Sequence, residues 1–250
     1  MASYFPYWID GPIEMSTSAQ LGSEVDGMLT EYALLNEDAV VHVPGHLSFE
    51  EAATLPCTAV AAWHAITAGE PLIAGQTVLT QESGAVSLFA IQFAKVFGAR
   101  VIATTSSDQK AERLKGLGAD EVVNYRTTPN WEVAVRELTE GRGVDRVIEV
   151  GGAGTLQKSI RSLALEGCIA LVGRVASEEI SISNDVLSSS IYTLRRIVVG
   201  SRAQLVTMNK AIAVNRIKPV IDRVFTFQEA HEAFLYFEEQ TCFGKVIIKH

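Results

Sequence analysis

Residues 76–104, QTVLTQESGAVSLFAIQFAKVFGARVIAT, decide the fold. A short apolar run, Gln76–Gln81, is followed by a longer apolar run, Val86–Phe97, and then by a second short run, Arg100–Thr104. Gly98 is placed to end a helix, because glycine adopts the left-handed conformation at little cost. The stretch therefore predicts a buried strand, a helix and a second buried strand that runs parallel to the first.

The same alternation continues for about a hundred residues. Further strands are predicted at Glu121–Asn124, Arg146–Val150, Cys168–Val172 and Arg196–Val199. Further helices are predicted at Asp108–Leu117, Trp131–Thr139 and Leu156–Leu165. Short apolar strands that alternate with helices indicate a doubly wound α/β fold, in which helices cover both faces of a parallel sheet.

The two ends of the chain have a different pattern. Near the N-terminus, Met28–Leu35 and Ala39–Val43 are predicted strands, and Leu47–Ala65 is a predicted helix that begins with a Ser48/Glu51 capping box. Near the C-terminus, the predicted elements are a strand at Ile221–Phe227, a helix at Ala230–Glu239 and a strand at Gly244–Lys249. We expect the two ends to meet as a small second domain.

Composition limits the classes of partner. The chain of 250 residues has a net charge of −8, which disfavours binding to nucleic acid or to an anionic membrane surface. No apolar run approaches the roughly 20 residues that a membrane-spanning helix needs. The N-terminal sequence has no signal-peptide pattern, and the three cysteines are widely separated. These features predict a soluble cytoplasmic protein.

The turn after the first strand is the first candidate binding motif. A dinucleotide-binding turn has the pattern G-x-G-x-x-G/A, and the corresponding residues here are Glu82–Ser87. Gly84 matches the middle glycine, and Ser87 is small enough for the third position. Glu82 brings a carboxylate to a place that should attract an anion. The motif is compatible with a phosphate-binding turn and with a purely structural turn.

The residues at the end of the second strand indicate which nicotinamide dinucleotide would bind. An NAD site usually has an acidic residue there, which binds the ribose hydroxyls. This chain has Thr104–Ser107 and then Lys110, which suit a 2′-phosphate better than a free diol. The alternative is a polar loop with a solvated lysine. The sequence therefore predicts NADP as the cofactor, either bound weakly or lost because of Glu82 in the phosphate turn.

The chain resembles the medium-chain dehydrogenase/reductase family, in its zinc-independent, quinone-reductase-like or alcohol-dehydrogenase-like branch. The stretches that carry the resemblance are DGMLTEY at 26–32, LSFEEAATLPCTAVAAW at 47–63, the helix start at 83–95, GLGADEVVNY at 116–125, VVGSR at 198–202 and FGKVII at 243–248. The resemblance implies a Rossmann domain inserted into a GroES-like catalytic domain whose N-terminal part is missing. The implied boundaries are 1–58 for the remnant of the catalytic domain, 59–203 for the Rossmann domain and 204–250 for the C-terminal return.

The resemblance also implies a set of cofactor-binding residues. Thr58 would lie near the nicotinamide, and the pyrophosphate would be faced by Ser83, Gly84, Ala85 and Val86. The adenosine end of NADP would be held by Ser106, Ser107, Lys110 and Tyr125. The nicotinamide half would be lined by Val150, Gly151, Val172, Gly173, Ser201 and Arg202. Gly244 and Lys245 would close over the cofactor.

Cys57 corresponds to a zinc ligand in zinc-dependent relatives. Catalytic zinc needs three protein ligands, and His42, His46 and His64 have no ligand-like spacing with Cys57. We therefore expect a structural cysteine and no catalytic metal. The aromatic residues Tyr4, Phe5, Tyr7 and Trp8, together with Trp63 and His64, line a substrate pocket in one interpretation. In the other they only pack.

The function that these features predict is hydride transfer between NADP(H) and a carbonyl or an activated alkene, by a homodimer joined through the edge strand in Ile191–Val199. No catalytic acid or base stands out. Two alternatives are a non-redox enzyme, such as a cyclase or isomerase that binds a hydrophobic substrate in the same fold, and a non-catalytic relative. A fold alone does not distinguish them.

Overall fold

The computed structural model describes residues 1–173, 182–239 and 241–250. The chain divides into two compact units. Unit 1 consists of Met1–His64 and Val199–His250, and unit 2 consists of Ala65–Val198.

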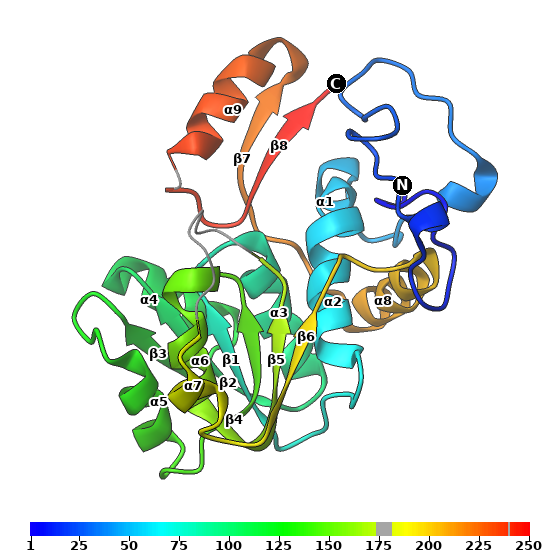
Figure 1. Cartoon of the computed structure of the whole chain (residues 1–250). Helices are drawn as coiled ribbons and strands as arrows, with labels where there is room; N and C mark the ends of the chain where they lie inside the picture. The colour runs from blue at the N-terminus through cyan, green and yellow to red at the C-terminus, as the bar shows by residue number, and fades with distance from the viewer. Residues whose placement is uncertain (174–181, 240) are drawn as a thin grey trace. The chain divides into compact units, whose positions relative to one another are not determined.

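Unit 2 is built on a six-stranded sheet in which every pairing is parallel (Figure 1). The strand order is β3-β2-β1-β4-β5-β6. The strands are β1 (Thr77–Gln81), β2 (Arg100–Thr105), β3 (Glu121–Asn124), β4 (Val144–Glu149), β5 (Leu163–Leu171) and β6 (Tyr192–Arg196). This order is that of the Rossmann fold, so the predicted fold class of this part is confirmed.

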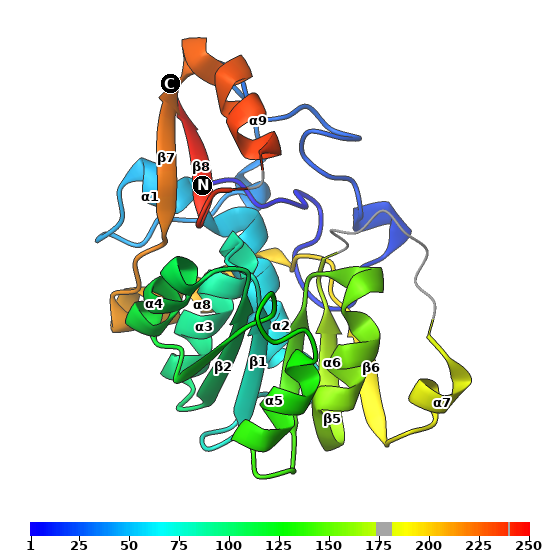
Figure 2. The same ribbon diagram turned by 90° about the vertical axis from the view of Figure 1, so that its left-hand side faces the viewer.

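Helices cover both faces of this sheet (Figure 2). They are α3 (Ala85–Val96), α4 (Asp108–Leu117), α5 (Trp131–Leu138), α6 (Leu156–Ser162) and the short α7 (Asn184–Leu187). Helices α3 and α4 contact each other and the strands β1 to β3, whereas α5 contacts α6, and α6 packs on β4 and β5. A cluster of buried apolar side chains includes Trp131 of α5, Val147 of β4 and Ile160 of α6.

Local signals explain why these elements begin and end where they do. The Ser107 side chain caps α4 by accepting from the Lys110 N–H at 3.3 Å, and Gly118 ends the helix at a φ of +118°. Gly98 has a φ of +73° after α3, as its position in the sequence predicts. The predicted bounds of α4 and β3 are confirmed to the residue.

Unit 1 contains a two-stranded parallel sheet of β7 (Ile221–Thr226) and β8 (Lys245–Lys249). Its helices are α1 (Phe49–Ala53), α2 (Val60–Thr67, which continues into unit 2), α8 (Arg202–Asn215) and α9 (Ala230–Glu238). A π-helical turn lies at Leu55–Ala59, and 3₁₀ turns lie at Met15–Thr17, Glu37–Ala39 and Phe227–Glu229, with a further one at Gly152–Gly154 of unit 2. None of the helices in the described ranges is long and apolar enough to cross a membrane.

Several predictions for unit 1 are wrong. The predicted helix Leu47–Ala65 starts with its Ser48/Glu51 capping box, but the π-helical turn splits it, and Pro56 in that turn lacks an N–H for the helical ladder. The structure assigns no strand to Met28–Leu35, and Leu34 is fully exposed. Ala39–Val43 makes only an isolated bridge, from Val40 to Ala2.

The predictions after β5 also need correction. The sixth strand is Tyr192–Arg196 rather than Arg196–Val199, and α8 was not predicted. Strand β5 begins at Leu163, where a helix was predicted to continue. The strand β6 is largely exposed, so it lacks the continuous apolar run by which buried strands are recognised.

Candidate nucleotide-binding site

The carboxyl ends of the strands in unit 2 meet at one edge of the sheet (Figure 1). From β1 the sheet grows in one direction through β2 and β3, and in the opposite direction through β4, β5 and β6. The strand order therefore reverses between β1 and β4. Ligands of open α/β sheets bind outside the carboxyl ends of the strands at such a switch point. The predicted residues that follow the strands there are Ser83, Gly84, Ser106, Ser107, Tyr125, Val150, Gly151, Val172 and Gly173.

The turn after β1 leaves the start of α3 open to an anion. Gly84 is the N-cap residue of this 12-residue helix, and it offers no side-chain cap to the first N–H groups. A Cβ built at Gly84 would meet no atom within 4 Å. Ala85 and Val86 form the first turn of the helix. Unsatisfied N–H groups and the helix dipole favour a phosphate at this place, so the residues present fit a dinucleotide pyrophosphate.

The buried side chain of Ser87 holds this turn in place. Its hydroxyl donates to the backbone carbonyl of Gln81 at 2.5 Å, and the side chain is 1% exposed. A small residue at this position lets the helix pack closely on the strand, which is the role of the third glycine in the motif.

A buried polar pair lies at the switch point itself. The Gln81 amide donates to the Glu149 carboxylate at 2.9 Å and to the Ser159 hydroxyl at 2.8 Å. The other oxygen of Glu149 accepts from the N–H groups of Gly151 and Gly152, both at 2.9 Å. The pair therefore holds the turn after β4, where Val150 and Gly151 lie. Neither Gln81 nor Glu149 was among the predicted site residues.

The side chain of Glu82 is paired with the predicted adenosine end of the site. Glu82 has a φ of +62°, and its N–H donates to the Thr104 carbonyl at 2.8 Å. The Tyr125 hydroxyl lies near the Glu82 carboxylate and the Ser106 side chain. Burial and then the Glu82 carboxylate raise the pKa of Tyr125, while Ser106 opposes them. Glu82, which follows β1, therefore interacts electrostatically with Tyr125, which follows β3.

Lys110 lies in the first turn of α4 in unit 2, and the remaining predicted cofactor-binding residues belong to unit 1. Thr58 lies in the π-helical turn, and its hydroxyl donates to the Thr54 carbonyl at 2.9 Å. Ser201 caps α8 through a capping box with Gln204, and the Arg202 N–H donates to the Trp8 carbonyl at 2.9 Å. Gly244 has a φ of +109°, and Lys245 begins β8.

The aromatic residues predicted for a substrate pocket pack on one another in unit 1. Phe5 and Trp8 are 1% and 5% exposed, and their ring centroids are 5.7 Å apart. Tyr4 packs edge-on against Phe5, and Trp8 packs against His64, whose Nδ1 lies 2.8 Å from the Val199 carbonyl. Trp63 and Tyr7 are less buried. The buried rings of Phe5 and Trp8 serve the core of unit 1, and the substrate pocket stays a prediction.

Cys57 is a largely buried thiol. Burial raises its pKa, and nearby Lys245 opposes that effect. Within the described ranges, no group of three or more His, Cys, Asp or Glu side chains is arranged to hold a metal ion.

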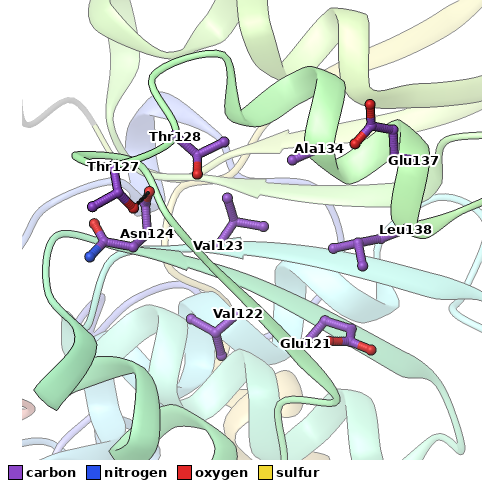
Figure 3. Close-up of a pocket in the computed structure, with 9 residues that line it drawn as sticks. All are labelled: Glu121, Val122, Val123, Asn124, Thr127, Thr128, Ala134, Glu137 and Leu138. Carbon is purple, nitrogen blue, oxygen red and sulfur yellow. Dashed lines mark hydrogen bonds between the residues drawn. The ribbon is translucent and has the colours of Figure 1, made fainter.

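A surface pocket of about 570 Å³ lies beside β3, away from the switch point (Figure 3). It is lined by Glu121, Val122, Val123, Asn124, Thr127, Thr128, Ala134, Glu137 and Leu138. None of the predicted site residues lines it. Its lining carries two carboxylates, so it offers little to a phosphate.

Comparison with known proteins defines the family. Residues 85–214 match the model of the zinc-binding dehydrogenase family. The chain is 41% identical to the zinc-type alcohol dehydrogenase-like protein C1773.06c of Schizosaccharomyces pombe over all of its own length and 74% of that protein's length. The chain therefore belongs to the medium-chain dehydrogenase/reductase family, whose named relatives are oxidoreductases, and it corresponds to their C-terminal part.

Solved structures agree with this assignment. An NAD-dependent alcohol dehydrogenase superposes with a TM-score of 0.87 at 36% identity, over 93% of this chain and 68% of that one. The mycobacterial protein Rv1454c, solved with NADPH, superposes with a TM-score of 0.75 at 28% identity, over 83% of this chain and 67% of that one. Nicotinamide nucleotides are thus bound by members of the family.

Proposed function

We propose that the chain is an oxidoreductase that transfers hydride, without zinc, between a nicotinamide dinucleotide and a carbonyl or activated-alkene substrate. The observation that carries the proposal is the open N-terminus of α3 at Gly84, located at the switch point of a Rossmann sheet in a member of this family. The bound dinucleotide would supply the hydride. The protein would supply binding and orientation.

The residues of unit 2 divide that work among them. The N–H groups of Ala85 and Val86 would hold the pyrophosphate at the start of α3. Gln81 and Glu149 would fix the turn at Val150 and Gly151, which the resemblance assigns to the nicotinamide half. Lys110 and the hydroxyls after β2 favour NADP(H), whereas Glu82 at the same edge favours the unphosphorylated form.

Glu82 was the residue that suggested a non-redox use of the fold. Its carboxylate lies near Tyr125, at the predicted adenosine end of the edge, and raises the pKa of that residue. This position gives the acid a use in a dinucleotide site, so the redox function is the better supported one.

Transfer of an isotopic label tests the proposal. The purified chain is incubated with a nicotinamide-deuterated reduced dinucleotide and a panel of quinones, enones and aldehydes. We expect deuterium in the product of at least one of these classes, as seen by mass spectrometry. Saturable dinucleotide binding with no label in any product would contradict the proposed reaction.

A further inference from the structure

The turns after β1, β2 and β3 lie in register at one edge of the sheet. Gln81 of β1 pairs with Thr104 of β2, so the next residue, Glu82, is level with Thr105. Thr105 pairs in turn with Asn124 of β3, so Tyr125 is level with Ser106. The residues that follow three neighbouring strands, Glu82, Ser106 and Tyr125, therefore form a row along this edge of the sheet.

Backbone hydrogen bonds tie this row together. The Glu82 N–H donates to the Thr104 carbonyl at 2.8 Å, and the Tyr125 N–H donates to the Thr105 carbonyl at 3.0 Å. The side chains also lie close enough to interact, because the Glu82 carboxylate raises the pKa of Tyr125 and Ser106 lowers it. The register therefore places Glu82 beside the end of β2, although it follows β1.

The end of β2 lacks the acid that a diol-binding site would have. Thr105 stands there, fully buried, and its hydroxyl oxygen has no hydrogen-bond partner among the described residues. A carboxylate at this edge accepts hydrogen bonds from the two ribose hydroxyls of an unphosphorylated dinucleotide and repels a 2′-phosphate. Glu82 provides a carboxylate at the same edge.

The backbone of Glu82 supports a functional reason for this acid. A φ of +62° is unfavourable for a residue with a side chain, by about 1 kcal/mol relative to glycine. Strained residues of this kind concentrate at binding sites, where the side chain has a use. Lys110, which would oppose Glu82, carries its charge on a flexible side chain of the adjacent helix α4.

We infer that Glu82 is the residue that selects the cofactor, that its carboxylate binds the adenosine ribose hydroxyls, and that the chain prefers NAD(H) to NADP(H). Tyr125 acts as a positioning residue for the carboxylate. The inference rests on the proposed function, because it requires that a dinucleotide binds at this edge. It reverses the preference that Lys110 and the loop after β2 predict from the sequence.

Titrations of the whole chain with NADH and with NADPH, followed by nicotinamide fluorescence, test this. We expect the wild type to bind NADH roughly 10- to 100-fold more tightly than NADPH, the range of one charge–charge contact near a protein surface. Glu82→Gln should weaken NADH, tighten NADPH and reverse their order. Tyr125→Phe should reduce the preference without reversing it. The matched control is Glu121→Gln, which removes the same charge from the opposite end of β3 and should leave the ratio unchanged.

The outcomes separate this inference from the proposed function. If both dinucleotides bind and NADPH binds more tightly, or if Glu82→Gln changes both affinities equally, the role of Glu82 is refuted while the cofactor site stands. If neither dinucleotide binds the wild type or any variant, the proposed function fails and this inference fails with it. Thermal melting of each variant shows whether a loss of affinity comes from a loss of fold.

Discussion

The side chains of Gln81 and Glu149 join β1 to β4 through a hydrogen bond of 2.9 Å in the interior of unit 2. The two side chains are 2% and 0% exposed. Glu149 also accepts from backbone N–H groups and from the hydroxyls of Thr155 and Ser159. A buried carboxylate needs such a set of donors, because an unpaired one is very costly. The pair fixes the relative position of the two turns between which the strand order reverses.

Gln81→Leu should destabilise the chain by about 2–4 kcal/mol, because it removes two donated hydrogen bonds and leaves part of the Glu149 carboxylate unsatisfied. Urea unfolding followed by circular dichroism measures the change. Gln76→Leu, the same substitution at a half-buried position just before β1, is the control and should cost much less. Equal effects of the two substitutions would show that the network contributes little.

Gly143→Ala tests the close approach of the chain just before β4. Gly143 has a φ of +90°, and a Cβ there would meet the carbonyl carbon and oxygen of Leu163 at 2.5 Å. Gly141 has a similar φ of +83°, but a Cβ there would meet nothing within 4 Å. Gly141→Ala should therefore cost about 1 kcal/mol for its backbone conformation alone, and Gly143→Ala clearly more. Similar unfolding free energies for the two variants would contradict this account.

Cys57 should not bind zinc. A zinc ligand must be a thiolate, whereas burial raises the pKa of the Cys57 thiol. Elemental analysis after dialysis against a chelator is expected to find zinc well below one equivalent, and Cys57→Ser is expected to leave the metal content unchanged. One equivalent of zinc that Cys57→Ser removes would overturn this prediction.

The chain should form a homodimer through β6. This strand is at the end of the strand order and presents exposed residues, among them Leu194 at 40% exposure. An unpaired edge strand is a surface on which a second copy can extend the sheet. Light scattering at micromolar concentration should give the mass of a dimer, and Leu194→Asp should shift it toward the monomer. A monomeric wild type would refute the pairing.

The Rossmann part of the fold could be predicted because its signals are local. Glycines at 98 and 118 mark the helix ends, and each is visible within a few residues of sequence. The start of α8 has an equally clear local signal, the capping box of Ser201 and Gln204, from which this helix could also have been predicted. Residues Met28–Leu35 have a strand-like sequence pattern, but the structure assigns no strand to them. A strand also needs a neighbouring strand with which to pair, and sequence pattern alone does not supply one.

The candidate site could be predicted only in part. The turn at Gly84 follows from spacing, whereas the pairing of Gln81 with Glu149 spans 68 residues and depends on the strand order. From the sequence alone, the negative charge of Glu82 is expected to weaken pyrophosphate binding at the turn after β1. Its proximity to Tyr125 depends on the register of three strands, which no local pattern contains.

Gly84→Asp gives the most direct test that a dinucleotide binds at the start of α3. Gly84 has an ordinary φ of −70° and open space around its Cβ, so an aspartate is accommodated there. As an N-cap residue it should leave the unfolding free energy unchanged or raise it by a few tenths of a kcal/mol. Its carboxylate, however, would occupy the place of the pyrophosphate. In fluorescence titrations we expect saturable binding of the reduced dinucleotide to the wild type, and at least roughly tenfold weaker binding to an equally stable Gly84→Asp. Equal affinity of the two proteins, or no binding to the wild type, would contradict the account.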